Sequence, residues 1–156
     1  MKNTSFGPVG AVVWATILAG VLDIAAVFAF WAPQGVPPST VMQSIASSIT
    51  GAASYQGGAG SIALGTFLHV LVTVVFAAAY VIVALRMRFL TTRPLLWGPL
   101  YGLLAYVIMT FGVVPLSNAQ FGGDWPPPPV NLAASLFIHL FLFGLPIAWA
   151  ASRLRR

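Results

Sequence analysis

Long apolar runs alternate with short polar segments along this chain. Four runs, at about 9–31, 61–85, 95–116 and 130–151, are long enough to cross a bilayer, which takes roughly 20 helical residues. In lipid only helices and closed barrels satisfy their own backbone, and these runs lack the alternation of barrel strands. The pattern therefore predicts an all-α integral membrane protein, a single four-helix transmembrane bundle over residues 1–156.

The connection between the first two runs contains a shorter amphipathic segment, at about 39–50. Its apolar residues recur at helical spacing on one face, namely Val41, Met42, Ile45, Ala46 and Ile49. The other face is largely polar, with Gln43, Ser44, Ser47 and Ser48. This pattern predicts a short interfacial helix in the first outer loop.

The connection between the last two runs ends in Trp125 followed by four prolines at 126–129. Consecutive prolines form a stiff extended segment. We interpret this one as a rigid spacer that sets the entry of the last helix, with a docking strip for a partner as the alternative.

Composition narrows the class of protein. Hydrophobic residues make up 59% of the chain, charged residues only 6%, and mean hydropathy is +0.94. A soluble domain carries about 25% charged residues, so a water-soluble globule and a disordered chain are both excluded. Cysteine is absent, which excludes disulfides, thiolate metal sites, iron–sulfur clusters and catalytic thiols.

The positive charges indicate the orientation. They lie before the first run, between the second and third, and after the fourth, as Lys2, Arg86, Arg88, Arg93, Arg153, Arg155 and Arg156. With four crossings these places share one side, which the positive-inside rule makes the cytoplasm, so both termini are predicted to be cytoplasmic. The net charge of +5 is then explained by headgroup anchors, and nucleic acid is not an expected partner.

Three ionisable residues lie within the apolar runs: Asp23, His69 and His139. Counting from the outer ends of their helices, each lies roughly 12 Å below the outer surface at 1.5 Å per residue. Tyr106 and Met109 of the third run reach a similar depth. Ionisable groups inside a membrane are costly, so their agreement in depth predicts a shared proton or ligand site.

Several chemistries fit these residues. A carboxylate beside imidazoles changes its charge between pH 5 and 8, which suits proton handling from the outer side. Two imidazoles and a carboxylate also form a ligand set for a divalent metal. His69 and His139 are candidate axial ligands of haem b, with Gly65 making room for the porphyrin. The purely structural interpretation, here called the bland interpretation, is an Asp23–His pair that bridges helices through a hydrogen bond, without turnover or transport. No cofactor is predicted.

Glycine and proline predict local packing. Gly98 and Gly102 have the GxxxG spacing of close helix contact. Gly144 and Pro146 predict a bend in the last run, and Pro115 is expected to end the third.

A wider set of residues carries a resemblance to a known family. These are Asp23, Ser44-Ile45-Ala46-Ser47, Gly57-Gly58, Leu68-His69, Tyr101-Gly102, Val114-Pro115-Leu116-Ser117, and His139 with Gly144-Leu145-Pro146-Ile147. The chain resembles the YagU-like uncharacterised bacterial inner-membrane proteins. That resemblance implies a bacterial inner membrane and a loose association with acid resistance, and it brings no catalytic residue or cofactor.

No phosphate loop, nucleophile elbow or HExxH motif occurs in the chain, so an enzyme is not expected. The prediction is a small non-enzymatic inner-membrane protein, an accessory subunit of a larger complex or an acid-tolerance factor. It would contact the lipid bilayer and either a membrane-protein partner or further copies of itself. The first alternative is a proton-coupled transporter or proton pathway, for which small multidrug transporters also offer a four-helix precedent. The second is a haem- or metal-binding redox component.

Overall fold

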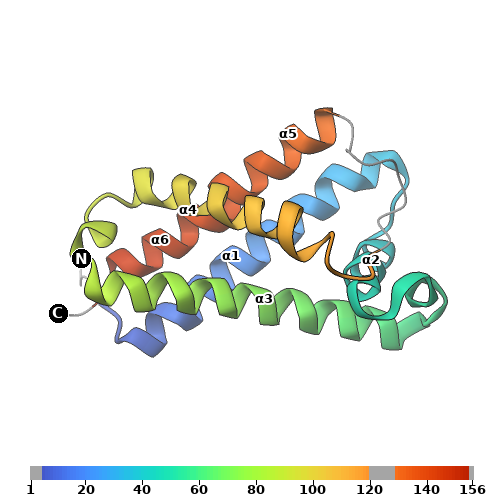
Figure 1. Cartoon of the computed structure of the whole chain (residues 1–156), viewed down its shortest axis with the longest axis horizontal. Coiled ribbons are helices and arrows are strands. Elements are labelled where there is room, and N and C mark those ends of the chain that lie inside the picture. The colour runs from blue at the N-terminus through green and yellow to red at the C-terminus, as the bar shows by residue number, and fades with distance from the viewer. Residues whose placement is uncertain (1–4, 120–128, 155–156) are drawn as a thin grey trace.

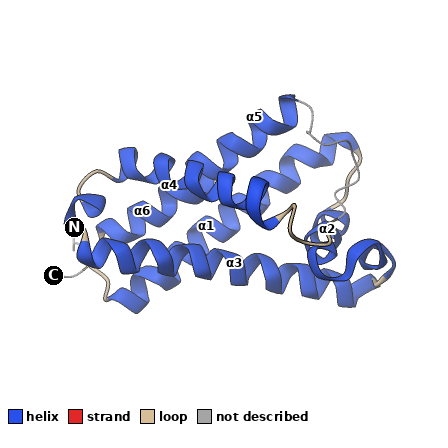
Figure 2. Cartoon of the chain, viewed as in Figure 1, coloured by secondary structure: helices blue, strands red, loops and turns tan. Residues whose placement is uncertain are grey.

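The computed structural model describes residues 5–119 and 129–154, and nearly all of them are helical (Figure 2). The main elements, in chain order, are α1 (Pro8–Trp31), α2 (Pro38–Thr50), α3 (Gly58–Arg86), α4 (Pro94–Ile108), η4 (Met109–Val113), α5 (Pro129–Phe137), η5 (Ile138–Gly144) and α6 (Leu145–Ser152). Here η4 and η5 are π-helical turns. Four stretches are long and apolar enough to cross a membrane, at Pro8–Gln34, Gly58–Arg86, Pro94–Val113 and Val130–Ser152. The predicted all-α four-helix membrane bundle is confirmed.

One end of the bundle gathers the start of α1, the α3–α4 connection and the end of α6 (Figure 1). There the backbone N–H of Phe6 donates to the carbonyl of Arg153 at 2.7 Å. Arg86, Arg88 and Arg93 lie at this end too. The described basic residues therefore share one side, as the count of four crossings predicts, and we call it the basic end.

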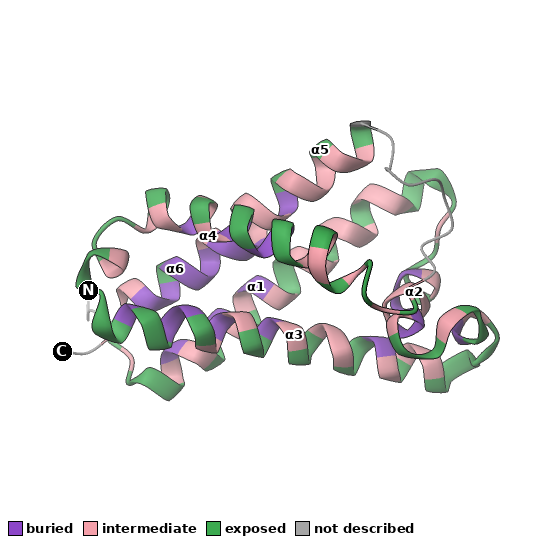
Figure 3. Cartoon of the chain, viewed as in Figure 1, coloured by how far each residue is buried: buried purple, intermediate pink, exposed green. Residues whose placement is uncertain are grey.

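Alanines make up much of the interior, and many large apolar side chains lie on the outside. Ala15, Ala19, Ala77 and Ala105 are each 0% exposed, and the core also includes Ala11, Ala84, Ala148, Ala150 and Ala151. Phe67, Phe111 and Ile82, by contrast, are more than half exposed. Figure 3 shows exposed positions along the outer faces of α3 and α4. An apolar exterior with a small-residue interior is the arrangement of helices that pack against one another in lipid.

Glycines bring α4 into backbone contact with the fourth span. A Cβ added at Gly102 would lie 2.1 Å from the carbonyl oxygen of His139, and one added at Gly144 would lie 2.3 Å from that of Gly98. The close helix packing predicted from the GxxxG spacing is confirmed, and its partner is η5. η5 ends at Gly144, two residues before Pro146, so the helix is irregular here; the predicted bend itself stays a prediction. Proline lacks the N–H that would continue a regular α-helical ladder.

The predicted amphipathic helix exists as α2, and it packs against α3. Gly65 of α3 lies under Met42, because a Cβ there would fall 1.9 Å from the Met42 carbonyl oxygen. Asn118, which follows the third span, also contacts α2. The backbone N–H of Asn118 donates to Ser48 O at 3.0 Å, and its side-chain amide to Ile49 O at 3.2 Å.

The predicted faces of α2 need one correction. Ile49, placed on the apolar face, is 56% exposed, whereas Ser47, placed on the polar face, is 0% exposed. α2 packs against both α3 and η2 (Gly51–Gln56), and Ser47 hydrogen-bonds to Tyr55 of η2. The Ser47 hydroxyl also donates to Ser44 O at 2.6 Å. The predicted spacer at Trp125 and 126–129 lies outside the described residues, apart from Pro129, which begins α5.

Replacing Gly102 with alanine tests the helix contact. The new methyl group meets the His139 carbonyl, so we expect Gly102→Ala to lower the free energy of unfolding by about 1–3 kcal/mol, as overpacking does. Thermal unfolding of the purified protein measures this. Gly112→Ala is the matched control, because its Cβ would meet nothing within 4 Å. Equal stability of the two variants would contradict the contact.

Candidate functional site

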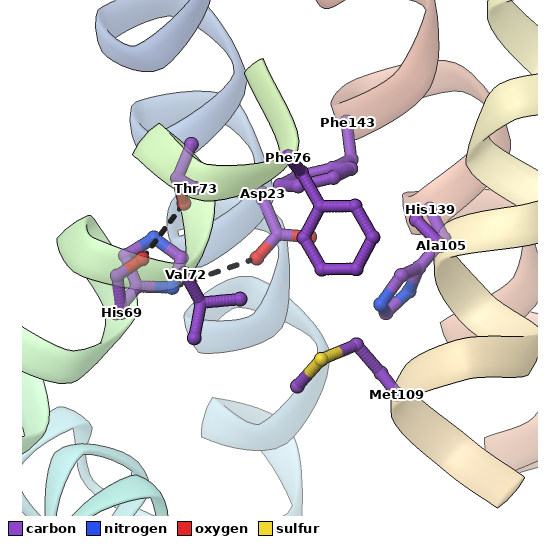
Figure 4. Close-up of a pocket in the computed structure, with 9 residues that line it drawn as sticks. All are labelled: Asp23, His69, Val72, Thr73, Phe76, Ala105, Met109, His139 and Phe143. Carbon is purple, nitrogen blue, oxygen red and sulfur yellow. Dashed lines mark hydrogen bonds and ion pairs between the residues drawn. The ribbon is translucent and has the colours of Figure 1, made fainter. Parts of the chain in front are cut away.

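Asp23, His69 and His139 line one cavity of about 80 Å³ in the bundle. They come from α1, α3 and η5 respectively. Figure 4 shows the Asp23 carboxylate between the two imidazoles, which enter from opposite sides. The remaining lining residues are Val72, Thr73, Phe76, Ala105, Met109 and Phe143. The structure thus brings together the three ionisable residues that the sequence places at one depth.

Close approach of α1 and α3 orients His69. Its Nε2 lies 3.0 Å from the carbonyl oxygen of Gly20 on α1. A carbonyl only accepts hydrogen bonds, so Nε2 must carry the hydrogen. The other nitrogen, Nδ1, then faces Asp23 Oδ2 at 4.0 Å. In the neutral imidazole this Nδ1 is an acceptor.

His139 is oriented by its own helix. Its Nδ1 lies 2.8 Å from the carbonyl oxygen of Ser135, four residues earlier. By the same argument Nδ1 carries the hydrogen, and Nε2 is the acceptor of the neutral ring. The residue lies in η5, and π-helical turns often occur at functional sites. The rings of Tyr106 and Phe143 pack against the imidazole, at centroid distances of 5.5 and 6.0 Å.

Asp23 is buried without a direct hydrogen bond among the described residues. Its side chain is 13% exposed. Its Oδ1 has no partner in the described part of the chain, and the 4.0 Å from Oδ2 to His69 Nδ1 exceeds hydrogen-bond length. The bland interpretation is confirmed in part: Asp23 and His69 form a pair between α1 and α3 within ion-pair distance, but their 4.0 Å separation is longer than a hydrogen bond. A separation of this length leaves room for a small molecule to bridge the two groups.

The other two candidates differ in position. Met109 of η4 lines the cavity, and Figure 4 shows its thioether extending into it. Tyr106 is not a lining residue; it packs behind His139. Sequence reasoning missed the parts played by the carbonyls of Gly20 and Ser135, because no sequence pattern indicates which backbone oxygen an imidazole will contact.

The haem alternative does not fit this fold. The space beside Gly65, which was expected to admit a porphyrin, is filled by Met42 of α2. The cavity of about 80 Å³ is also far below the roughly 300–1,000 Å³ of pockets for drug-sized ligands. For a metal ion, residues 5–119 and 129–154 hold no group of three or more His, Cys, Asp or Glu side chains close enough to bind one.

Comparisons of the chain with protein-family models, with curated proteins and with solved structures find no match.

Replacing Asp23 with asparagine separates a structural role from a functional one. A buried carboxylate without a hydrogen bond contributes little to folding, and neutralising it removes a desolvation cost. We expect Asp23→Asn to leave the free energy of unfolding unchanged or to raise it by up to about 3 kcal/mol. Thermal unfolding is the measurement, and a loss of stability of more than about 1 kcal/mol would show that Asp23 holds the helices together.

Proposed function

We propose that this protein binds a proton in the membrane interior at Asp23, His69 and His139, and that it serves as a proton-coupled transporter or proton pathway. The observation that carries the proposal is the placement of one carboxylate between two imidazoles around one cavity. Ionisable side chains at such depth are costly and mark proton relays and ion pathways in membrane proteins.

The orientation of the imidazoles supports proton transfer. With Nε2 of His69 and Nδ1 of His139 holding their hydrogens against backbone carbonyls, the remaining nitrogens are free bases. An incoming proton has three places to reside: Asp23, His69 Nδ1 and His139 Nε2. The cavity of about 80 Å³ has room for water, which needs about 10–15 Å³ per molecule on this measure. Asp23 with water then joins the two imidazoles into one relay.

Aromatic side chains separate this site from the basic end. The rings of Phe76 and Phe143 meet edge to face at 5.8 Å, and Tyr101 contacts Phe76 and Tyr80 at 6.2 and 4.8 Å. Both tyrosine hydroxyls donate to backbone carbonyls, Tyr101 to Phe76 O and Tyr80 to Leu90 O. The layer offers no continuous chain of exchangeable groups, which favours proton entry from the end that carries α2.

We further propose that the basic end is cytoplasmic and that the membrane is a bacterial inner membrane. The positive-inside rule supports the first part, and the resemblance to YagU-like proteins supports the second. Acid tolerance agrees with a proton site that is reached from outside. The accessory-subunit role and the non-enzymatic character stay predictions.

Proton flux tests the proposed function. Protein reconstituted into liposomes with an internal pH dye should acidify the lumen under a pH gradient, because the site accepts and releases protons. We expect Asp23→Asn to reduce the rate at least tenfold. Asp124→Asn is the matched control, since Asp124 is the other of the two acidic residues and lies between the third and fourth spans. Equal rates in wild type and Asp23→Asn, or loss of flux in both variants, would contradict the proposal.

Single cysteines test the orientation, and the chain contains none of its own. Ser152→Cys lies at the basic end, whereas Ala52→Cys lies in the turn η2 (Gly51–Gln56) at the opposite end. We expect a membrane-impermeant maleimide to label Ala52→Cys in intact spheroplasts and Ser152→Cys only after permeabilisation. The reverse pattern would invert the proposed topology.

A further inference from the structure

The cavity around Asp23 lacks a free hydrogen-bond donor, and from this we infer that it binds ammonium, a small cation rich in N–H groups. The inference deepens the proposed function and rests on it, because ammonium would occupy the place of the site proton. It is carried by three donor hydrogen bonds, one unpartnered oxygen and the size of the cavity.

Every side-chain donor among the lining residues is engaged by a backbone carbonyl. The Thr73 hydroxyl donates to His69 O at 2.8 Å. His69 Nε2 donates to Gly20 O, and His139 Nδ1 donates to Ser135 O. With neutral imidazoles and an ionised carboxylate, the cavity is left with acceptors only: both Asp23 oxygens, His69 Nδ1 and His139 Nε2.

The spacing of two of these acceptors suits a bridging donor. His69 Nδ1 and Asp23 Oδ2 are 4.0 Å apart. A central nitrogen placed about 2.9 Å from each, the usual N–H···acceptor length, spans that gap. Asp23 Oδ1, buried without a partner in the described part of the chain, supplies another acceptor. Among the described residues no group of three or more His, Cys, Asp or Glu side chains is placed to hold a metal ion.

The walls of the cavity favour a cation that carries N–H groups. Phe76 and Phe143 border the same space as Asp23 (Figure 4), and aromatic faces attract cations in dehydrated sites. Water could also bridge the acceptors, but it would leave the charge of a buried carboxylate uncompensated. The volume of about 80 Å³ admits ammonium or methylammonium, whereas tetramethylammonium has no N–H group to donate to the acceptors. Potassium is similar in size to ammonium, yet it prefers oxygen ligands and cannot donate to imidazole nitrogen.

Binding couples ammonium to the proton. When the site holds one proton on any of its three bases, that proton must leave for the acceptors to receive ammonium. The exchange is balanced in atoms and charge: one ammonium ion enters and one proton leaves. The two ions therefore compete for one negative charge at Asp23, which couples their movements if both cross the membrane.

Thermal unfolding of the purified full chain tests the inference. Ammonium, methylammonium, potassium and tetramethylammonium chlorides would be compared at equal ionic strength and fixed pH. A ligand that binds the folded state raises the unfolding midpoint with its concentration. We expect a saturable rise with ammonium and methylammonium, no such rise with potassium or tetramethylammonium, no response in Asp23→Asn, and an unchanged response in Asp124→Asn.

Two results would overturn the inference. One is an equal shift with ammonium and potassium, which marks a general salt effect. The other is a response to ammonium that persists in Asp23→Asn. Liposome flux separates this failure from that of the proposed function. Asp23-dependent proton flux without an ammonium-dependent shift of the unfolding midpoint would refute the ammonium site alone, whereas absence of Asp23-dependent flux would refute the proton site itself.

Discussion

Contact between helix backbones is the constraint on which the rest of this structure depends. In a bilayer, large apolar side chains gain little by moving from lipid to the protein interior, so helices associate where small residues let their backbones touch. Gly102 reaches the His139 carbonyl, Gly144 reaches Gly98, and Gly65 lies under Met42. Fully buried alanines extend the same close packing along α1 and α6. Many of the large apolar side chains thereby lie on the outer surface.

The same contacts determine the chemistry of the site. Because α1 lies close to α3, the Gly20 carbonyl comes within 3.0 Å of His69 Nε2 and decides which nitrogen carries the hydrogen. In η5 the Ser135 carbonyl does the same for His139 Nδ1. Backbone oxygens, rather than further side chains, orient both imidazoles, as partner groups orient histidines in metal sites. The polarity of the cavity follows from helix packing, and this links the glycines and alanines to the proposed proton relay.

Most of the fold could be predicted from the sequence, because length and hydropathy alone define membrane spans. The start of α1 and the end of the fourth span lie within one residue of the predicted limits. The shared depth of Asp23, His69 and His139 was also predictable, since rise per residue fixes depth. The side chain of Ile49 and the space beside Gly65 were predicted wrongly, because both depend on how α2 packs against α3. The role of the Gly20 carbonyl could not be predicted either, because helical periodicity specifies the faces of a helix and not the atom contacts between helices.

Asp23 is an ionisable residue in a mostly apolar part of the bundle. Its neighbours Phe76, Phe143, Ala105 and Val72 create an apolar environment, in which an ionised carboxylate without a hydrogen bond is destabilising. An apolar residue at this position would pack in the bundle at no such cost. Local violations of otherwise consistent packing are expected where function requires them. The cost falls when a proton or a small cation occupies the cavity, because the negative charge is then compensated. Under the proposed function, this cost favours the binding of positive charge beside Asp23.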